Sequence, residues 1–143
     1  MNDRYHIFDH TADAGIEITG KTIADIFLNA AAGMYHIMGI YDTYSGTVIT
    51  RLKLIDPTLE DLLVSFLSEL NFFITVRKKI LCTAMNLSIE QIGTNLVLNA
   101  HAGTYDLSIS DLSALREIKS VTYHQLLIVR EQDEYLARVI FDI

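Results

Sequence analysis

The sequence predicts an α+β fold with mostly antiparallel sheets and two main helices packed on the sheet. Segments with the two-residue alternation of β-strands lie at both ends of the chain and in its middle. Two long segments carry apolar residues at spacings of three, four and seven, as helices with one buried face do. After these helices the chain reads as strands joined by short turns, which favours antiparallel pairing.

The first third of the chain reads as two short strands followed by a helix. Residues 5–8 and 15–20 have strand-like patterns, and Gly20 ends the second strand. Thr22 and Asp25 form a capping-box pattern, with Asp in place of Glu, and Gly39 is suited to end the helix. We interpret the apolar face of this helix as core and not as a cofactor site: Ile23, Ile26, Phe27, Ala30, Ala31, Met34, Ile37 and Met38.

A third strand and a second helix follow. Residues 47–55 alternate with one wetter face, which predicts a half-buried strand. Asp56 is expected to cap the next helix, with Pro57 at its first position, where the missing N–H costs no hydrogen bond. The buried stripe of this helix is predicted to be Leu59, Leu62, Leu63, Phe66, Leu67, Leu70, Phe73 and Ile74.

The rest of the chain is predicted to form two pairs of strands. Residues 81–92 and 96–102 read as strands joined by a turn at 93–95. Residues 121–129 and 135–143 read as a final hairpin around 130–134. Because the chain has one proline and no low-complexity segment or linker, residues 1–143 are expected to form a single domain.

Composition narrows the classes of function. The formal net charge of −7 argues against broad binding to nucleic acid, which needs clustered Lys and Arg. The basic cluster at residues 77–79 is interpreted as a solvated helix end. Cys82 lies in an apolar run and is expected to be a small buried side chain rather than a nucleophile. No apolar stretch reaches the roughly 18 residues of a membrane span, and the first residues lack a signal-peptide pattern, so a cytoplasmic location is expected.

One polar cluster separates the first two strands. The stretch FDHTADAGI places Asp9, His10, Thr11 and Asp13 within five positions of a loop. Asp and Thr side chains also close turns through bonds to the backbone, so a purely structural role stays open. The cluster is a candidate functional site because it holds two carboxylates and an imidazole.

The last residues are a second candidate. The final strand would place Asp142 beside the free carboxylate of Ile143, and these like charges repel unless a cation or a basic group joins them. If the two ends of the chain meet, Asp13, Asp142 and the Ile143 carboxylate offer hard oxygen ligands. Such ligands suit Ca²⁺, Mg²⁺ or Mn²⁺ better than a structural zinc ion. With His10 or His6 added, a Zn²⁺ site stays open.

A third polar feature is Lys119, which enters a strand-like segment that continues to His124. An edge lysine with its stem on apolar surface is one explanation of such a residue.

Taken together, these motifs resemble the archease family over essentially the whole chain. The motifs that carry the resemblance are DHTAD at 9–13, F-x-x-A-A-x-x-M at 27–34, L-L-V-x-F-L-x-E-L at 62–70, E-I-K-x-V-T-Y-H at 117–124 and V-I-F-D-I at 139–143. In this order they form a highly specific set. The resemblance implies a small α+β protein with a metal site formed by Asp13, Asp142 and Ile143, the set that the charge argument also reaches.

The resemblance also implies a function. Archeases are partners of the RtcB-type RNA ligase, which joins RNA ends in tRNA splicing and RNA repair. That ligase first attaches guanylate from GTP to its own histidine, with divalent metal. An archease speeds this guanylylation and allows repeated turnover, so the resemblance implies an activator and not an enzyme, which engages RNA only indirectly. The implied contacts to the partner or to phosphate are Lys119, Glu69 and His10.

The sequence departs from the family at two places and leaves two other functions open. Gly103-Thr104 stands where many members carry Gly-Glu, which removes a carboxylate that the site could otherwise have included, and Phe66 stands where Trp is common. One alternative is a chaperone or a modulator of tRNA-modifying enzymes. The other is a stand-alone metal-dependent hydrolase, for which the sequence offers no nucleophile–base pair, P-loop or HExxH helix.

Overall fold

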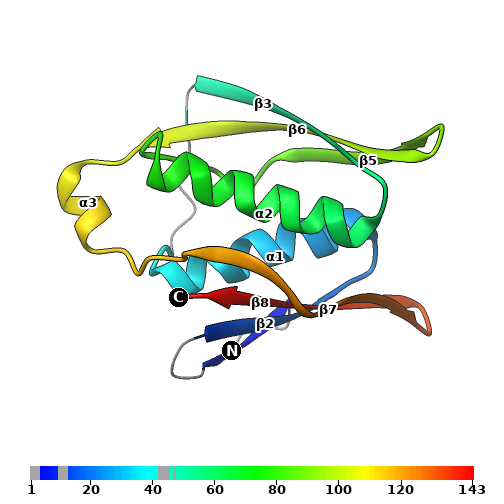
Figure 1. Ribbon diagram of the computed structural model, residues 1–143. Helices are drawn as coiled ribbons and strands as arrows, with labels where there is room; N and C mark the ends of the chain where they lie inside the picture. The colour runs from blue at the N-terminus through cyan, green and yellow to red at the C-terminus, as the bar shows by residue number, and fades with distance from the viewer. Residues whose placement is uncertain (1–3, 10–12, 42–45, 47) are drawn as a thin grey trace.

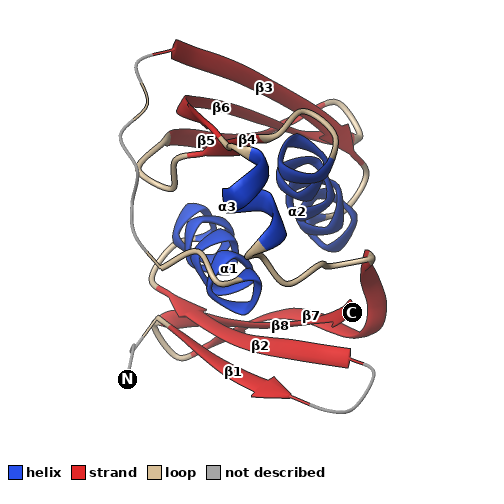
Figure 2. Cartoon of the chain, turned by 90° about the vertical axis from the view of Figure 1, so that its left-hand side faces the viewer, coloured by secondary structure: helices blue, strands red, loops and turns tan. Residues whose placement is uncertain are grey.

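The computed structural model describes residues 4–9, 13–41, 46 and 48–143. Two four-stranded antiparallel sheets enclose the two long helices, α1 and α2, which lie side by side between them (Figure 2). Each helix therefore buries apolar side chains against a sheet and against the other helix. The predicted α+β class with two main helices on antiparallel sheet is confirmed.

The first sheet joins the two ends of the chain. Its order is β1-β2-β8-β7, with β1 Tyr5–Asp9, β2 Asp13–Gly20, β8 Glu134–Asp142 and β7 Ser120–Glu131. All of β2 pairs with β8, from Asp13 opposite Asp142 to Gly20 opposite Tyr135. The start of β2, the C-terminus and the segment after α3 consequently lie at the same end of the molecule (Figure 1).

The second sheet is built around β6. This strand, Asn95–Asp106, pairs along one edge with β3, Val48–Asp56, and along the other with β5, Asn86–Ile92, and β4, Lys79–Leu81. The single strand predicted over 81–92 is wrong, because the chain leaves the sheet at residues 82–85. It turns there between two separate stretches of the β6 edge, and the Met85 N–H donates to the Thr83 carbonyl.

Helix α1, Ile23–Met38, is bounded as the sequence predicts. The Thr22 side chain accepts from the Asp25 N–H, and the Asp25 carboxylate accepts from the Thr22 N–H, so the capping box forms. Gly39 has a φ of 94° and ends the helix in the left-handed region, where glycine has no steric penalty.

Helix α2, Leu59–Thr75, starts later than predicted. Thr58 caps it by accepting from the Asp61 N–H at 3.1 Å, so the prediction of Asp56 as cap and Pro57 as first helical residue is wrong. Asp56 instead stays in β3, opposite Leu96, since sheet pairing holds the backbone extended up to that residue. A short helix α3, Ile109–Ser113, was not predicted, although Ser108 and Asp111 form its capping box.

The final hairpin is longer than predicted, because β7 and β8 pair as far as Glu131 and Glu134 around a two-residue turn.

Cys82 is buried, as expected. In the part of the chain that the structure describes, no helix is long and apolar enough to cross a membrane.

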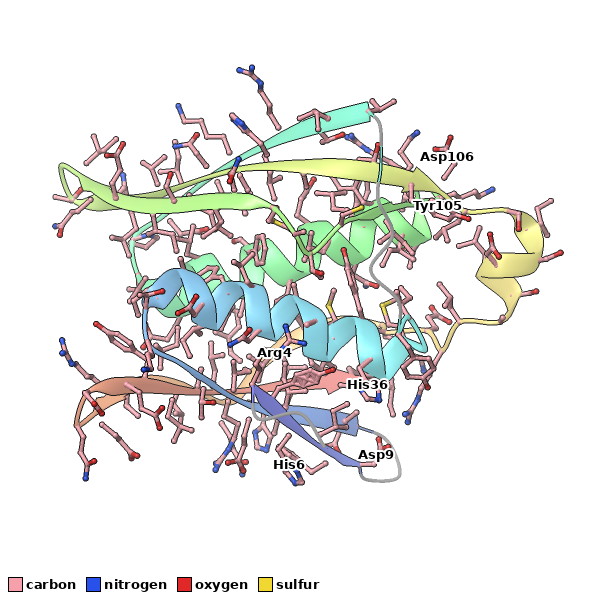
Figure 3. The ribbon with its side chains drawn as sticks, turned by 180° about the vertical axis from the view of Figure 1, so that it is seen from behind. Arg4, His6, Asp9, His36, Tyr105 and Asp106 are labelled. Atoms are coloured by element: carbon pink, nitrogen blue, oxygen red, sulfur yellow. The ribbon has the colours of Figure 1, made fainter. Side chains whose placement is uncertain are left out.

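The two faces of the first sheet differ. On the inner face, toward the helices, Ala14, Ile16, Val139 and Phe141 are fully buried. The outer face carries the alternate residues of the same strands, among them Asp13, Gly15 and Glu17 on β2. The first sheet thus presents polar side chains on the side away from the core. Figure 3 labels His6 and Asp9 at this sheet, and Tyr105 and Asp106 at the second sheet on the other side of the helices.

Candidate functional site

Two carboxylates face each other at the end of the first sheet. Asp13 begins β2 and Asp142 ends β8, and the register places them directly opposite. Opposite residues of an antiparallel pair point to the same face, with Cβ atoms about 5 Å apart. Both side chains therefore share the outer face of the sheet. We call Asp13, Asp142 and Ile143 the carboxylate tip.

Asp13 carries the clearest sign of a missing partner. Its Oδ1 atom is buried and accepts no hydrogen bond from any described residue. A buried carboxylate oxygen is costly unless a hydrogen-bond donor or a cation satisfies it. The Phe8 ring packs over Gly15, two residues along the same face, and covers the sheet next to the tip. These residues fit a hard divalent cation, since two carboxylates converge and one of their oxygens has no other partner.

Ile143 is held in place by its side chain. Asp142 is exposed, whereas the Ile143 side chain is half-buried and packs against the core. The backbone of Asp142 is also fixed, because its carbonyl accepts from the Lys119 N–H at 2.8 Å. Ile143, the residue predicted to supply the third carboxylate, is consequently held by packing and by the bonded backbone beside it.

The segment at residues 116–119 connects the tip to both long helices. The Arg116 N–H donates to the Met38 carbonyl at the end of α1, at 2.9 Å. Ile118 is buried, and its carbonyl accepts from Asn71 Nδ2 on α2 at 2.9 Å. With the bond from Lys119 to Asp142, this segment ties α1 and α2 to β8 within four residues.

Lys119 lies beside a groove between α2 and β7. The hollow has a volume of about 270 Å³ and is lined by Ser68, Asn71, Phe72, Thr75, Lys119, Ser120 and Val121. Lys119 is exposed and forms no ion pair among the described residues. Asn71 Oδ1 is buried without a hydrogen-bond partner, as Asp13 Oδ1 is. In the described chain, Asp13 Oδ1 and Asn71 Oδ1 are the buried side-chain atoms without a hydrogen-bond partner. Lys119 is linked to both places: its N–H bonds to Asp142, which faces Asp13, and it follows Ile118, whose carbonyl bonds to Asn71.

The structure does not bring every predicted residue to the tip. Glu69 is half-buried on α2, on the inner side of the sheet, whereas the Asp13–Asp142 pair lies on the outer face. His6 lies opposite Glu17, roughly 13 Å along β2 from Asp13 at about 3.3 Å per residue. His10 lies outside the described residues. Among the described residues, no group of three or more His, Cys, Asp and Glu side chains could hold a metal ion. The third ligand that the sequence predicts is the Ile143 carboxylate.

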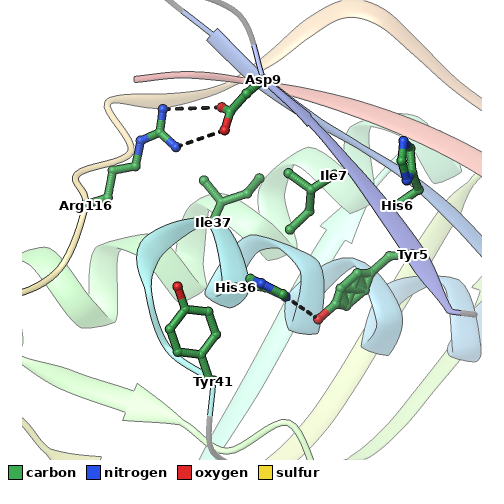
Figure 4. A pocket seen from close by; sticks show the side chains of 8 residues that line it. All are labelled: Tyr5, His6, Ile7, Asp9, His36, Ile37, Tyr41 and Arg116. Atoms are coloured by element: carbon green, nitrogen blue, oxygen red, sulfur yellow. Dashed lines mark hydrogen bonds and ion pairs between the residues drawn. The ribbon is translucent and has the colours of Figure 1, made fainter. Parts of the chain in front are cut away.

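A second hollow of about 380 Å³ lies on the inner side of β1 (Figure 4). Isoleucines 7 and 37 lie between an ion pair of Arg116 with Asp9, at 3.3 Å, and a hydrogen bond between the Tyr5 hydroxyl and His36 Nδ1, at 2.9 Å. Arg116 and Asp9 thus satisfy each other, and so do Tyr5 and His36. The polar side chains of these two pairs are hydrogen-bonded or ion-paired, whereas the tip and the groove beside Lys119 each hold a buried oxygen without a partner among the described residues.

Sequence reasoning missed Asn71 and Arg116. Both act through contacts between residues far apart in the chain, 47 positions for Asn71 with Ile118 and 107 for Arg116 with Asp9. A signal was present only for Asn71, a polar residue that follows Leu70 and precedes two phenylalanines. The ion pair of Arg116 had no local signal.

Comparisons with known proteins identify the family. The model of the Archease protein family (MTH1598/TM1083) matches residues 5–143. The archease of Methanosarcina barkeri is 33% identical over 140 residues, covering 98% of this chain and 96% of the relative, and that of Sulfolobus acidocaldarius is 26% identical. The solution structure of Methanobacterium thermoautotrophicum protein 1598 matches with a TM-score of 0.76 and 26% identity, covering 98% of this chain and 99% of that one. The crystal structure of an archease from Thermotoga maritima, described as a possible chaperone, has the same fold at 21% identity, with a TM-score of 0.60, and covers 95% of this chain and 94% of that one. The chain therefore belongs to the archease family.

Proposed function

We propose that this protein is an accessory activator of an RtcB-type RNA ligase, and that it promotes GTP-dependent guanylylation and repeated turnover of that ligase. The carboxylate tip is the part that acts. The observation that carries the proposal is the direct pairing of Asp13 with Asp142, with a buried Asp13 oxygen that no described residue satisfies. Membership of the archease family supports the choice of partner.

Asp13, Asp142 and the Ile143 carboxylate are the residues proposed to hold a divalent cation, with Ca²⁺, Mg²⁺ and Mn²⁺ as the candidates. A bound cation of this kind supplies positive charge that stabilises phosphoryl transfer and bridges phosphate oxygens. The chain itself provides the position of the ligands. The β2–β8 register holds the two aspartates on one face, and the Ile143 side chain anchors the residue that carries the third carboxylate.

Lys119 is proposed to contact the partner or a phosphate. Its backbone is bonded to Asp142, so its position depends on that of the tip, while its side chain is exposed and unpaired in the described structure. Glu69 and His10 stay predictions as functional contacts. RNA is proposed to be engaged through the ligase.

The test is guanylylation of a purified RtcB-type ligase with GTP and Mn²⁺, followed as covalent guanylate with and without a trace of this protein. We expect faster labelling with the wild-type chain and loss of that effect with Asp13→Asn or Asp142→Asn, which keep the size of the side chain. The matched control is Asp133→Asn, an exposed aspartate in the β7–β8 turn, far from the tip. Equal labelling with and without the wild-type chain, using a ligase shown to be competent, contradicts the proposal.

A chaperone role is the second candidate. The Thermotoga relative is described as a possible chaperone, and β3 of this chain exposes Val48, Ile49 and Ile55 on an edge strand. Such a surface would act without the tip. Suppression of aggregation of a test protein that persists in Asp13→Asn and is lost on replacing Ile49 and Ile55 by Thr would favour this function. Hydrolysis of nucleotides or phosphoesters by the chain alone would instead favour a stand-alone enzyme.

A further inference from the structure

The groove beside Lys119 has the shape of a site for an extended chain. One wall is a helix face, formed by Ser68, Asn71, Phe72 and Thr75 of α2 at spacings of three, four and seven. The other wall is the start of β7, Ser120 and Val121. In the described part of the chain β7 is an edge strand of the first sheet, so its outer side pairs with no other strand. Peptides commonly bind by adding a strand to such an edge beside a helix.

The groove also holds unsatisfied groups of three kinds. Asn71 Oδ1 is a buried acceptor without a donor among the described residues, and the amide nitrogen of the same side chain donates to the Ile118 carbonyl. Lys119 is a cation without a counter-ion among the described residues. Phe72 is 41% exposed and offers an apolar surface, although Arg77 stacks against part of its ring. A matching ligand needs an N–H or O–H donor, an anionic group and an apolar contact.

We propose that the α2–β7 groove binds an extended, acidic segment of a partner protein, which adds to the edge of β7 at Ser120 and Val121. Backbone N–H and C=O groups of the segment pair with the strand edge, and an Asp or Glu side chain pairs with Lys119. An apolar side chain of the segment packs on Phe72. A nucleotide would satisfy Lys119 but would leave the strand edge unpaired, so a peptide uses more of the groups on these two walls.

The length of the segment follows from the strand. The pairing of β7 with β8 is irregular between Thr122 and Leu127, and Gln125 in that stretch has a φ of 52°. Such a bulge twists a strand edge away from straight pairing. Added pairing is therefore confined to the start of β7, residues 120–122, so only a short segment of the partner can pair there.

The source of the segment rests on the proposed function, in which the partner is the RtcB-type ligase. The groove and the tip would then have different roles in activating the ligase. The groove contributes affinity for the partner, and the tip acts once the complex has formed. The two contributions can be separated, because a loss of affinity is overcome at high concentration and a loss of the acting group is not.

The experiment measures the dissociation constant of the complex with purified RtcB-type ligase and, separately, the guanylylation rate at saturating concentrations of this chain. Thr75→Trp, which fills the groove from an exposed helix position, and Phe72→Ser are expected to weaken binding at least tenfold. Both should reach the wild-type guanylylation rate at saturation, in contrast to Asp13→Asn. Ser110→Trp on the exposed helix α3 is the matched control and should bind as the wild type does.

A photo-crosslinking residue at position 72 identifies the occupant. Crosslinking to a ligase segment that contains Asp or Glu, reduced in Thr75→Trp, supports the proposal. Wild-type affinity in both groove variants overturns it, as does a crosslink to RNA or nucleotide alone. If the wild-type chain neither binds nor activates the ligase, the proposed function fails, and this assignment of the groove fails with it. If it activates but the groove variants bind normally, only the groove assignment fails.

Discussion

At the scale of single residues, the pairing of Asp13 with Asp142 places two like charges directly opposite each other in the sheet. Like charges directly opposite in an antiparallel pair are destabilising, by a few tenths of a kcal/mol to about 1 kcal/mol. The register nonetheless sets these two carboxylates opposite each other, and a buried oxygen of Asp13 has no donor among the described residues. An arrangement that costs stability in the isolated chain is typical of a binding site, since a ligand can relieve the cost.

Asp13→Asn is expected to have opposite effects on stability, relative to the wild type, with and without metal. In the presence of a chelator the variant should be as stable as the wild type or more stable, by up to about 1 kcal/mol, because the repulsion with Asp142 is gone. With Mn²⁺, Mg²⁺ or Ca²⁺ in excess, the wild type should gain thermal stability, because a cation that binds the folded state stabilises it. The variant should gain none, because it has lost a carboxylate of the proposed cation site. Thermal unfolding of both proteins under both conditions is the measurement.

The same experiment examines the third ligand. A short extension after Ile143 converts the terminal carboxylate into a peptide carbonyl, and should reduce the metal-dependent stabilisation without affecting the chelated protein. Equal metal-induced shifts with and without the extension would remove Ile143 from the ligand set. If none of these metal ions raises the thermal unfolding midpoint of the wild type, the proposed metal site is contradicted as a whole.

At the scale of elements, the 116–119 segment shows which kind of contact fixes a functional residue. Its ion pair between Arg116 and Asp9 is exposed, with side-chain accessibilities of 43% and 56%, and such pairs contribute little in water. Ile118, in contrast, is 1% exposed, within the core. Burial of Ile118, rather than the ion pair, is therefore expected to hold Lys119 next to Asp142.

The corresponding variants should differ clearly. Arg116→Gln is expected to change the free energy of unfolding by less than about 1 kcal/mol. Ile118→Ala should lower it by about 2–5 kcal/mol through loss of buried surface and the cavity that remains. Urea unfolding measures both, and hydrogen exchange of the Lys119 amide, which donates to Asp142, reports the local effect. A greater loss in Arg116→Gln than in Ile118→Ala would show that the ion pair holds the segment.

The elements also show what sequence can predict. Helix α1 was predicted because its start, its end and its apolar face are all local signals between Thr22 and Gly39. The start of α2 was misplaced because Asp56 and Thr58 both suit a helix cap, and only pairing with β6 assigns Asp56 to the strand. The tip residues could be named from the sequence, but their juxtaposition depends on a register between residues 13 and 142. That register is set by the alternation of buried residues along two strands at opposite ends of the chain.

At the scale of the whole molecule, the two sheets are connected through the layer of helices between them. Tyr35 adds a hydrogen bond from this layer to the second sheet. Tyr35 lies on α1, which packs on β2 of the first sheet, and its hydroxyl donates to the carbonyl of Leu81 in β4 of the second sheet at 2.7 Å. Its side chain is 3% exposed. Burial, and to a lesser degree the nearby Cys82, raises the pKa of the Tyr35 phenol well above its ordinary value of 10.0.

Tyr35 should therefore make the stability of the whole molecule sensitive to alkaline pH. Because the pKa of the phenol is higher in the folded chain than in the unfolded one, its contribution is fully present below pH 10 and is lost as the pH rises further. The loss is roughly 1.4 kcal/mol for each pH unit above 10, since only the unfolded chain then releases this proton. Tyr35→Phe should cost about 1–3 kcal/mol at pH 7, where the Leu81 carbonyl loses its donor, and less at pH 11. Urea unfolding of both proteins at pH 7 and pH 11 measures this difference, and the other tyrosines and lysines cancel because both chains contain them. A cost of Tyr35→Phe that is equal at the two pH values would mean that Tyr35 ionises as easily in the folded chain as in the unfolded one, and that the layer between the sheets is open to water at this position.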